Sequence, residues 1–287
     1  MMRKQVSTGL VAIVMGMYAA SSHATLISYN GFSSTAGLTL VGSAAPLTTA
    51  NGTVLQLTKS LGNQTGAAYS TSGITLGSNA TFSTTFQFSL SNPGGTYGPA
   101  DGFTFLLAAN TTGIGGLGGG LGYLGVPSSV AIEFDTFSNG ASDGNSNNHV
   151  SINTNGVLTD TALSNVYGMS SCSTTQAGCL SNGDIWTATI GYNGTALNVV
   201  LSDPAMGTSF NAISNYAINI ASYLGTNNAY VGFTASTGGG WESQSIVNWQ
   251  FANTTQLSSN SSVPEPASVA LFGLGIAVMG RRCRRKV

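Results

Sequence analysis

The segment Val130–Asn153 places two acidic side chains on one face of a predicted strand, with no basic residue near them. Side chains alternate between the two faces of a strand, so Val130 and Phe134 face a core. Glu133 and Asp135 then face the other way, side by side. Only 6% of the residues are charged, so composition alone does not explain this pair. Two adjacent carboxylates repel each other, and a bound cation removes that cost.

A loop rich in Gly, Asn and Ser follows this strand, carries Asp143 and returns to a strand-like sequence at His149. Carboxylate and carbonyl oxygens suit Ca²⁺, and carboxylates combined with an imidazole suit a transition ion such as Mn²⁺ or Zn²⁺. A solvated turn between two strands is the structural alternative. Turn chemistry accounts for Asn and Asp in the loop, but it does not account for Glu133 beside Asp135.

Six residues of this segment resemble the paired metal site of the legume-type (L-type) lectins in type and spacing: Glu133, Asp135, Phe137, Asn139, Asp143 and His149. The resemblance implies that the protein binds Ca²⁺ and a transition ion, which we expect to be Mn²⁺. It assigns the transition ion to Glu133, Asp135, Asp143 and His149. It assigns Ca²⁺ to Asp135, Asp143, the Asn139 side chain and the main-chain carbonyl of Phe137.

The same resemblance implies a carbohydrate site beside the ions. Asp101 precedes a predicted buried strand, and the matching Asp of the lectins binds sugar hydroxyls after a cis peptide bond, which would be Ala100–Asp101. Gly119 best matches a glycine whose N–H donates to a sugar oxygen. The other expected carbohydrate-binding residues are Asn139, Gly239, Gly240 and Trp241. For Trp241 two interpretations stay open: a platform that stacks on a sugar, or a loop residue packed onto the sheet.

Short strands and turns are predicted throughout residues 25–252. Ala80–Leu90 alternates as a half-buried strand and Ser91–Tyr97 is expected to be a loop. Asp184–Ser202 predicts a hairpin with an Asn-Gly turn, and Tyr230–Gly238 resembles a closing strand of the lectins. No helical periodicity persists. The predicted fold is all-β, a concanavalin-like β-sandwich (jelly roll) of two large antiparallel sheets.

The N-terminus indicates export. Residues 1–24 combine Arg3 and Lys4, an apolar run and a small-x-small site ending at Ala24, which is typical of a secretory signal peptide. A membrane-spanning helix is the alternative, but the apolar run is shorter than the roughly 20 residues that a span needs.

The C-terminus carries a second signal after a polar linker at residues 253–262. Residues 263–287 hold Pro264-Glu265-Pro266, an apolar segment and a basic tail. This arrangement resembles the PEP-CTERM sorting signal of Gram-negative bacteria, which an exosortase-type enzyme recognises. It implies transient membrane insertion and a destination at the cell surface or outside the cell. A single-span tail anchor is the alternative.

Removing both ends changes the charge and leaves two cysteines. Residues 25–262 keep Lys59 as their one Lys or Arg against eight of the nine acids, so the formal charge is 1 − 8 = −7. Such a body cannot neutralise a phosphate backbone, so nucleic acid is not an expected partner. In an exported protein, Cys172 and Cys179 are expected to form a disulfide bond.

These features together predict an exported, calcium-dependent carbohydrate-binding protein without enzymatic activity, acting on glycans or exopolysaccharide. One alternative is a structural matrix or adhesion protein whose metal site serves only folding. Another is a glycoside hydrolase on a related sandwich, which needs two carboxyl groups flanking the glycosidic bond. Glu133 and Asp135 open an E-x-D-x-x-E pattern of that kind, but its third position is Ser138.

Overall fold

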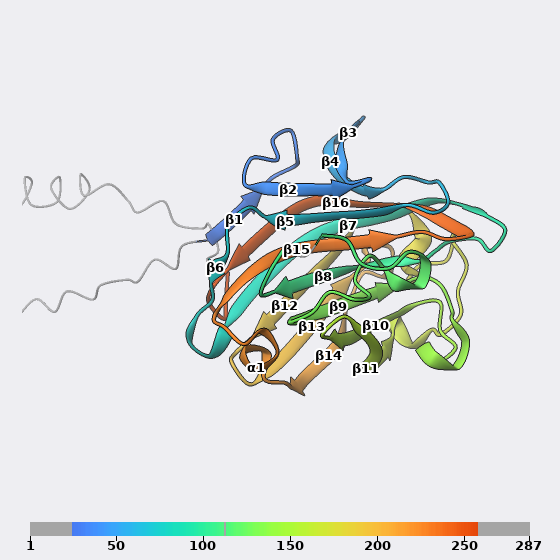
Figure 1. The fold of residues 1–287 in the computed structure, drawn as a ribbon. Helices are drawn as coiled ribbons and strands as arrows, with labels where there is room; N and C mark the ends of the chain where they lie inside the picture. The colour runs from blue at the N-terminus through green and yellow to red at the C-terminus, as the bar shows by residue number, and fades with distance from the viewer. Residues whose placement is uncertain (1–24, 112, 258–287) are drawn as a thin grey trace, which may run out of the picture.

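The computed structural model describes residues 25–111 and 113–257 as two stacked antiparallel sheets (Figure 1). This confirms the predicted all-β sandwich. The expected signal peptide (1–24), the sorting signal (263–287) and residues 258–262 of the linker lie outside the described residues. In the described part of the chain, no helix is long and apolar enough to cross a membrane.

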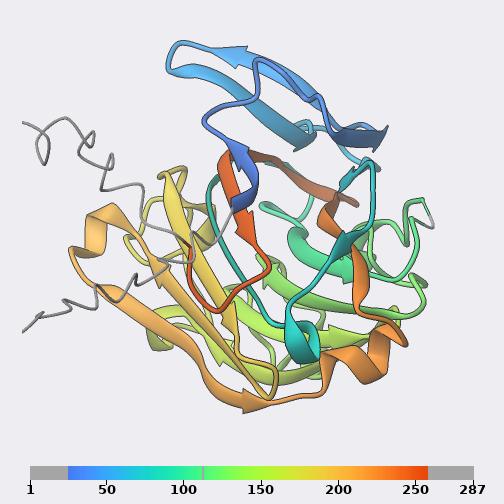
Figure 2. The ribbon, with the colours of Figure 1, turned by 90° about the vertical axis from the view of Figure 1, so that its left-hand side faces the viewer.

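Sheet A contains, in spatial order, β14 (Ser209–Ala217), β13 (Ala196–Ser202), β12 (Trp186–Tyr192), β7 (Phe82–Gly95), β16 (Gly240–Ala252), β4 (Gly52–Thr58) and β3 (Ala45–Thr49), with β1 (Thr25–Tyr29) beside β16. Sheet B contains β11 (Val157–Asn165), β10 (His149–Thr154), β9 (Ser129–Asp135), β8 (Gly102–Ala108), β15 (Asn228–Ser236), β5 (Thr65–Ser70) and β2 (Leu38–Gly42), with β6 (Ile74–Thr75) beside β15. The single α-helix of the described residues is α1 (Ile220–Leu224), and the short 3₁₀ turns are η1 (Ser78–Ala80), η2 (Gly118–Gly120), η3 (Gly140–Asp143), η4 (Val166–Gly168), η5 (Leu180–Asn182) and η6 (Pro204–Met206). Figure 2 shows the segment β2 to β4, in blue, at the top of the molecule.

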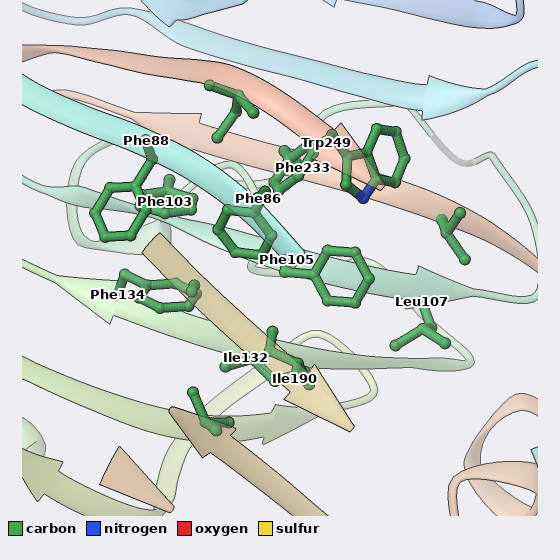
Figure 3. Packing of buried hydrophobic residues seen from close by; sticks show 14 of the residues in the cluster. Phe86, Phe88, Phe103, Phe105, Leu107, Ile132, Phe134, Ile190, Phe233 and Trp249 are labelled. Carbon is green, nitrogen blue, oxygen red and sulfur yellow. The ribbon is translucent and has the colours of Figure 1, made fainter. Parts of the chain in front are cut away.

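Aromatic side chains fill the space between the sheets (Figure 3). Phe86 of β7 lies at the centre, with ring centroids 5.0 Å from Phe233, 5.8 Å from Phe134 and 5.9 Å from Phe105. These rings come from the inward-facing positions of both sheets, as the alternation in Ala80–Leu90 predicts. Large buried aromatic rings contribute much of the stability of such a core.

Strand β7 is longer than the sequence suggests. It begins at Phe82 and continues to Gly95, so most of the expected loop Ser91–Tyr97 is strand. The reason is pairing with β16, where Gly94 lies opposite Trp241 and Gly95 opposite Gly240. Backbone groups that find a ladder partner stay extended even where Asn, Pro and Gly favour a turn.

The registers of β8, β9 and β10 bring the expected site residues to one end of sheet B. Asp135 pairs with Gly102 on one side and with His149 on the other. Asp101, immediately before β8, therefore lies near the end of β9. The predicted hairpin is also confirmed, because β12 pairs with β13 across a loop at Asn193.

Replacing Phe86 with alanine should lower the free energy of unfolding by roughly 3–5 kcal/mol, because it opens a cavity among closely packed rings. Denaturant unfolding followed by tryptophan fluorescence measures this change. Leu47→Ala is the control, since Leu47 is 39% exposed and its loss should cost less than about 0.5 kcal/mol. Equal losses for the two variants would contradict the proposed position of Phe86 in the core.

Candidate metal and carbohydrate site

Three potential metal ligands meet at the junction of β9 and β10. Glu133, Asp135 and His149 are buried, and one ligand atom from each lies within 4.8 Å of the others. The antiparallel register produces this cluster, because His149 is directly opposite Asp135 and Ser151 is opposite Glu133. Both acids and the histidine therefore project to the same face of sheet B, away from the aromatic core.

The hydrogen bonding of His149 leaves one ring nitrogen available for a cation. Its Nδ1 lies 3.2 Å from the carbonyl oxygen of Ser146, which can only accept, so Nδ1 carries the hydrogen. Nε2 then presents a lone pair, and it is buried with no partner among the described residues, as is Oδ1 of Asp143. Burial also lowers the pKa of His149, which favours the neutral, metal-binding form.

The carboxyl groups around this histidine are held at a cost that a cation would relieve. Burial, and then the neighbouring Asp160, raise the pKa of Glu133 well above its usual range. Burial, and then Glu133, do the same to the pKa of Asp135. A cavity of about 180 Å³ is lined by Gly119, Glu133, Asp135, Asn139, Ser142, Asp143, Leu158 and Asp160. Its donors are mainly carboxylate oxygens, which fit Ca²⁺ or Mn²⁺.

The loop after β9 is folded around the same carboxylates. Oδ1 of Asp135 accepts a hydrogen bond of 2.7 Å from the N–H of Phe137, and Oδ2 of Asp143 accepts one from the N–H of Asn139. The loop is thereby closed between two acids that the sequence assigns to metal binding. Asn139 remains exposed at its tip and Phe137 is half-buried. Of the six predicted metal ligands, Glu133, Asp135, Asn139 and Asp143 line one cavity, His149 lies beside Glu133 and Asp135, and Phe137 does not line the cavity.

Asp101 lies between glycine-rich segments next to this loop. Asp101 is 4% exposed, and its Oδ2 has no hydrogen-bond partner within the described ranges. A Cβ atom placed on Gly238 would lie 3.6 Å from this oxygen, and one on Gly118 4.0 Å from it. On Gly119 it would lie 2.8 Å from Oδ1 of Asn139. Asp101, Gly119 and Asn139, predicted from separate segments, therefore form one group.

The backbone and charge of Asp101 are also distinctive. The Ala100–Asp101 peptide bond is cis, which confirms the sequence expectation. Burial raises the pKa of Asp101 to about 7. The main chain is fixed from two sides, because its N–H donates to the carbonyl of Ser236 at 3.2 Å and its carbonyl accepts from the N–H of Thr136 at 3.0 Å.

The residues of the loop before β16 that were expected to bind carbohydrate differ in their exposure and packing. Gly240 is buried, and a Cβ atom on it would lie 3.1 Å from that of Ala100, so it lies close to the cis bond. Gly239 is exposed beside Tyr97. The half-buried indole of Trp241 covers Gly94 and Gly95. A Cβ atom placed on Gly94 would lie 2.5 Å from the indole, and one placed on Gly95 would lie 2.7 Å from it. Packing onto the sheet is thus the observed state of Trp241.

Glu242 is a buried acid that no pattern in the sequence singles out. It is fully buried in β16, where the hydroxyl of Thr136 donates to Oε1 at 2.6 Å. Its Oε2 has no partner in the part of the chain that the structure describes. Burial raises the pKa of Glu242 to about 7, and the charge of Asp101 acts in the same direction. Glu242 therefore connects β16 to the residue that follows Asp135.

A disulfide loop supports the segment before His149. Cys172 and Cys179 are bonded, with Cα atoms 5.9 Å apart, as predicted. Asn148 is buried, and its side chain donates to the carbonyl of Gly178 at 3.1 Å and accepts from the N–H of Leu180 at 2.9 Å. The loop at residues 170–180 is thus attached to the residue that precedes the histidine.

Two family models match the chain. The legume lectin domain matches residues 25–266, and the PEP-CTERM protein-sorting motif matches residues 262–286. The first covers all the described strands and the second supports export of the protein.

Curated relatives from plants are similar to this chain. A lectin of Pisum sativum is 31% identical over 234 residues, which are 74% of this chain and 78% of the pea protein. Agglutinin-2 of Cladrastis kentukea is 33% identical over 62% of this chain and 60% of its own length. A probable L-type lectin-domain containing receptor kinase I.2 of Arabidopsis thaliana is 29% identical over 52% of this chain. The match spans only 22% of that kinase.

Solved structures show the same architecture. Basic winged bean lectin with Tn-antigen superposes with a TM-score of 0.65 at 28% identity, covering 78% of this chain and 96% of that one. The metal-free form of lectin I-B4 from Griffonia simplicifolia gives a TM-score of 0.64 at 28% identity, covering 79% and 98%. The fold, the family match and the pea relative agree, and the chain belongs to the legume lectin domain family.

Proposed function

We propose that this protein is an exported lectin that binds glycans in a calcium-dependent manner at the group formed by Asp101, Gly119 and Asn139. The observation that carries the proposal is the free Oδ2 of Asp101, buried between Gly118 and Gly238. A buried acceptor that lacks a partner among the described residues costs free energy. Sugar hydroxyls would supply the missing donors.

Each member of the group has a distinct role in this proposal. The carboxylate of Asp101 accepts from two sugar hydroxyls, and the N–H of Gly119 donates to a sugar oxygen. Asn139 adds an amide beside Gly119. The exposed Gly239 would face the ligand, and the buried Gly240 would hold the loop against Ala100. Because the backbone of Asp101 is fixed by Ser236 and Thr136, little order has to be gained on binding.

Metal ions would hold this arrangement in place. Legume lectins bind Ca²⁺ and a transition metal, and the donors of this chain fit both. The carboxylates of Asp135 and Asp143 would bind both ions, and Glu133 and Nε2 of His149 would complete the transition-ion site. Phe137 and Asn139 would complete the calcium site. The bound ions supply positive charge that keeps these acids ionised.

We further propose the domain division given by the sequence, with a lectin domain at residues 25–252 between a signal peptide and a PEP-CTERM signal. An exosortase-type enzyme would process the C-terminal segment after transient insertion in the inner membrane. The lectin would then act at the cell surface or in the extracellular polysaccharide matrix.

Asp101→Asn should weaken glycan binding about 10- to 100-fold, because the charged acceptor of sugar hydroxyls is lost. A glycan array with the trimmed protein measures this. Asp184→Asn is the matched control, because Asp184 is partly exposed and does not line the cavity. If neither wild type nor variant bound any glycan, the structural matrix protein would be the better explanation.

Chelation with EDTA should abolish glycan binding and lower the melting temperature, and added Ca²⁺ with Mn²⁺ should restore both. The physical reason is that the buried acids lose their counter-charges and the Asn139 loop its attachment. The array and a thermal scan are run before and after dialysis. Full glycan binding in the chelated protein would contradict metal dependence while leaving a lectin function possible.

The stability of the metal-free protein should fall as the pH rises from about 4 to about 7. Burial raises the pKa of Asp101 and Glu242 to about 7, whereas carboxyl groups of the unfolded chain titrate near 4. The folded state keeps protons that the unfolded chain loses, so stability is complete below pH 4 and is lost through this window. Urea unfolding across the range tests the sign. A stability that increases with pH would contradict it.

Glu242→Gln should reduce this pH dependence. The amide oxygen still accepts from Thr136, but no buried charge forms, so the metal-free variant should match wild type at pH 4 and exceed its melting temperature at pH 8. If the melting temperature of the variant changed between pH 4 and pH 8 as much as that of wild type, Glu242 would not contribute to the pH dependence of stability.

A further inference from the structure

A fourth carboxylate reaches the metal cavity from β11. Asp160 lines the cavity together with Glu133, Asp135 and Asp143. The pairing of β11 with β10 shifts register twice, and Asp160 has a φ of +45°. Irregularities of this kind re-aim side chains in a strand. In this case the side chain concerned is an acid at a cavity already lined by three.

Two polar side chains of β10 hold Asp160 beside Glu133. The hydroxyl of Ser151 lies 2.9 Å from Oε2 of Glu133 and 2.9 Å from Oδ1 of Asp160. The amide nitrogen of Asn153 donates to the carboxyl of Glu133 and, at 3.1 Å, to that of Asp160. The amide oxygen of Asn153 also accepts from the N–H of Thr159 at 2.6 Å and of Asp160 at 2.9 Å.

This arrangement brings two acids together without a basic partner. Lys59, the one Lys or Arg of the described residues, is exposed and does not line the cavity. Ser151 and Asn153 donate hydrogen bonds but carry no charge. Within the described residues, the buried Nε2 of His149 and Oδ1 of Asp143 form no hydrogen bond. A cation that binds these atoms would also neutralise the pair of Glu133 and Asp160.

We propose that Asp160 supplies an additional carboxylate to the transition-ion site and biases that site toward Mn²⁺ over Zn²⁺. The inference rests on the metal-dependent function proposed above and adds a residue to its six ligands. Oxygen-rich sites suit Mn²⁺, whereas imidazole-containing sites with fewer oxygens suit Zn²⁺. Asp160 would therefore set which ion the site selects, while His149 and Glu133 set where the ion lies.

Titration of metal-free protein with MnCl₂ and with ZnCl₂ by calorimetry tests this inference. Asp160→Asn should lower the Mn²⁺ affinity about 10- to 100-fold, the range that partners of metal ligands usually contribute, and the Zn²⁺ affinity by less. The melting temperature provides a second readout. It should rise in the metal-free variant, because one repelling charge is gone, and the stabilisation by Mn²⁺ should shrink. A residue with only a structural role would lower both melting temperatures.

Controls separate the possible failures. Asp184→Asn, which removes a carboxylate outside the cavity, should leave both affinities unchanged. Asp160→Ser removes the acid without adding an amide and should reproduce the loss of Mn²⁺ binding if the asparagine variant does not fold. A Mn²⁺ affinity within twofold of wild type in Asp160→Asn, with binding lost in Asp135→Asn, would overturn the role of Asp160 alone. Wild-type protein that takes up neither ion would overturn the proposed metal dependence as well.

Discussion

Repulsion between buried carboxylates is the constraint around which this sandwich is built. Glu133, Asp135 and Asp143 are almost fully buried. Lys59 is the one Lys or Arg of the described residues, so basic side chains cannot neutralise these three acids. Burying charge without a partner is costly. Burial raises the pKa of Glu133 and of Asp135, and the proposed cations would offset the cost of ionising these two acids. The loop that carries Asn139 is attached to Asp135 and Asp143, and Asp101 is attached to Thr136, which follows Asp135.

Asp101 of the proposed carbohydrate site is connected to the same acids through the backbone. Thr136 follows Asp135 directly. Its N–H donates a hydrogen bond to the carbonyl of Asp101, and its hydroxyl donates one to the carboxyl of Glu242. The amide of Gln244 donates to the carbonyl of Ser236 at 2.9 Å. Strands β8, β9, β15 and β16 therefore meet near the Ala100–Asp101 bond, and a shift of the loop that begins at Thr136 would be transmitted to Asp101.

The sequence was sufficient where chemistry is local. A few neighbouring residues were enough to predict the clustering of Glu133 and Asp135, the loop that follows them and the inward-facing positions of β7. Asp160 and Glu242 could not be found in this way, because their surroundings depend on strand pairing. Asp160 reaches Glu133 through the irregular register of β10 with β11. Pairing with β16 also extends β7 through a stretch whose residues favour a turn.

The link between Asn148 and the disulfide loop has a consequence for the order in which the molecule matures. Thiols stay reduced before export, so the bond at Cys172 can form only outside the cytoplasm. Until then, only hydrogen bonds join the segment that carries Gly178 and Leu180 to Asn148, the residue before the histidine. In the proposed exported lectin, the covalent closure of this loop beside the histidine would thus follow export.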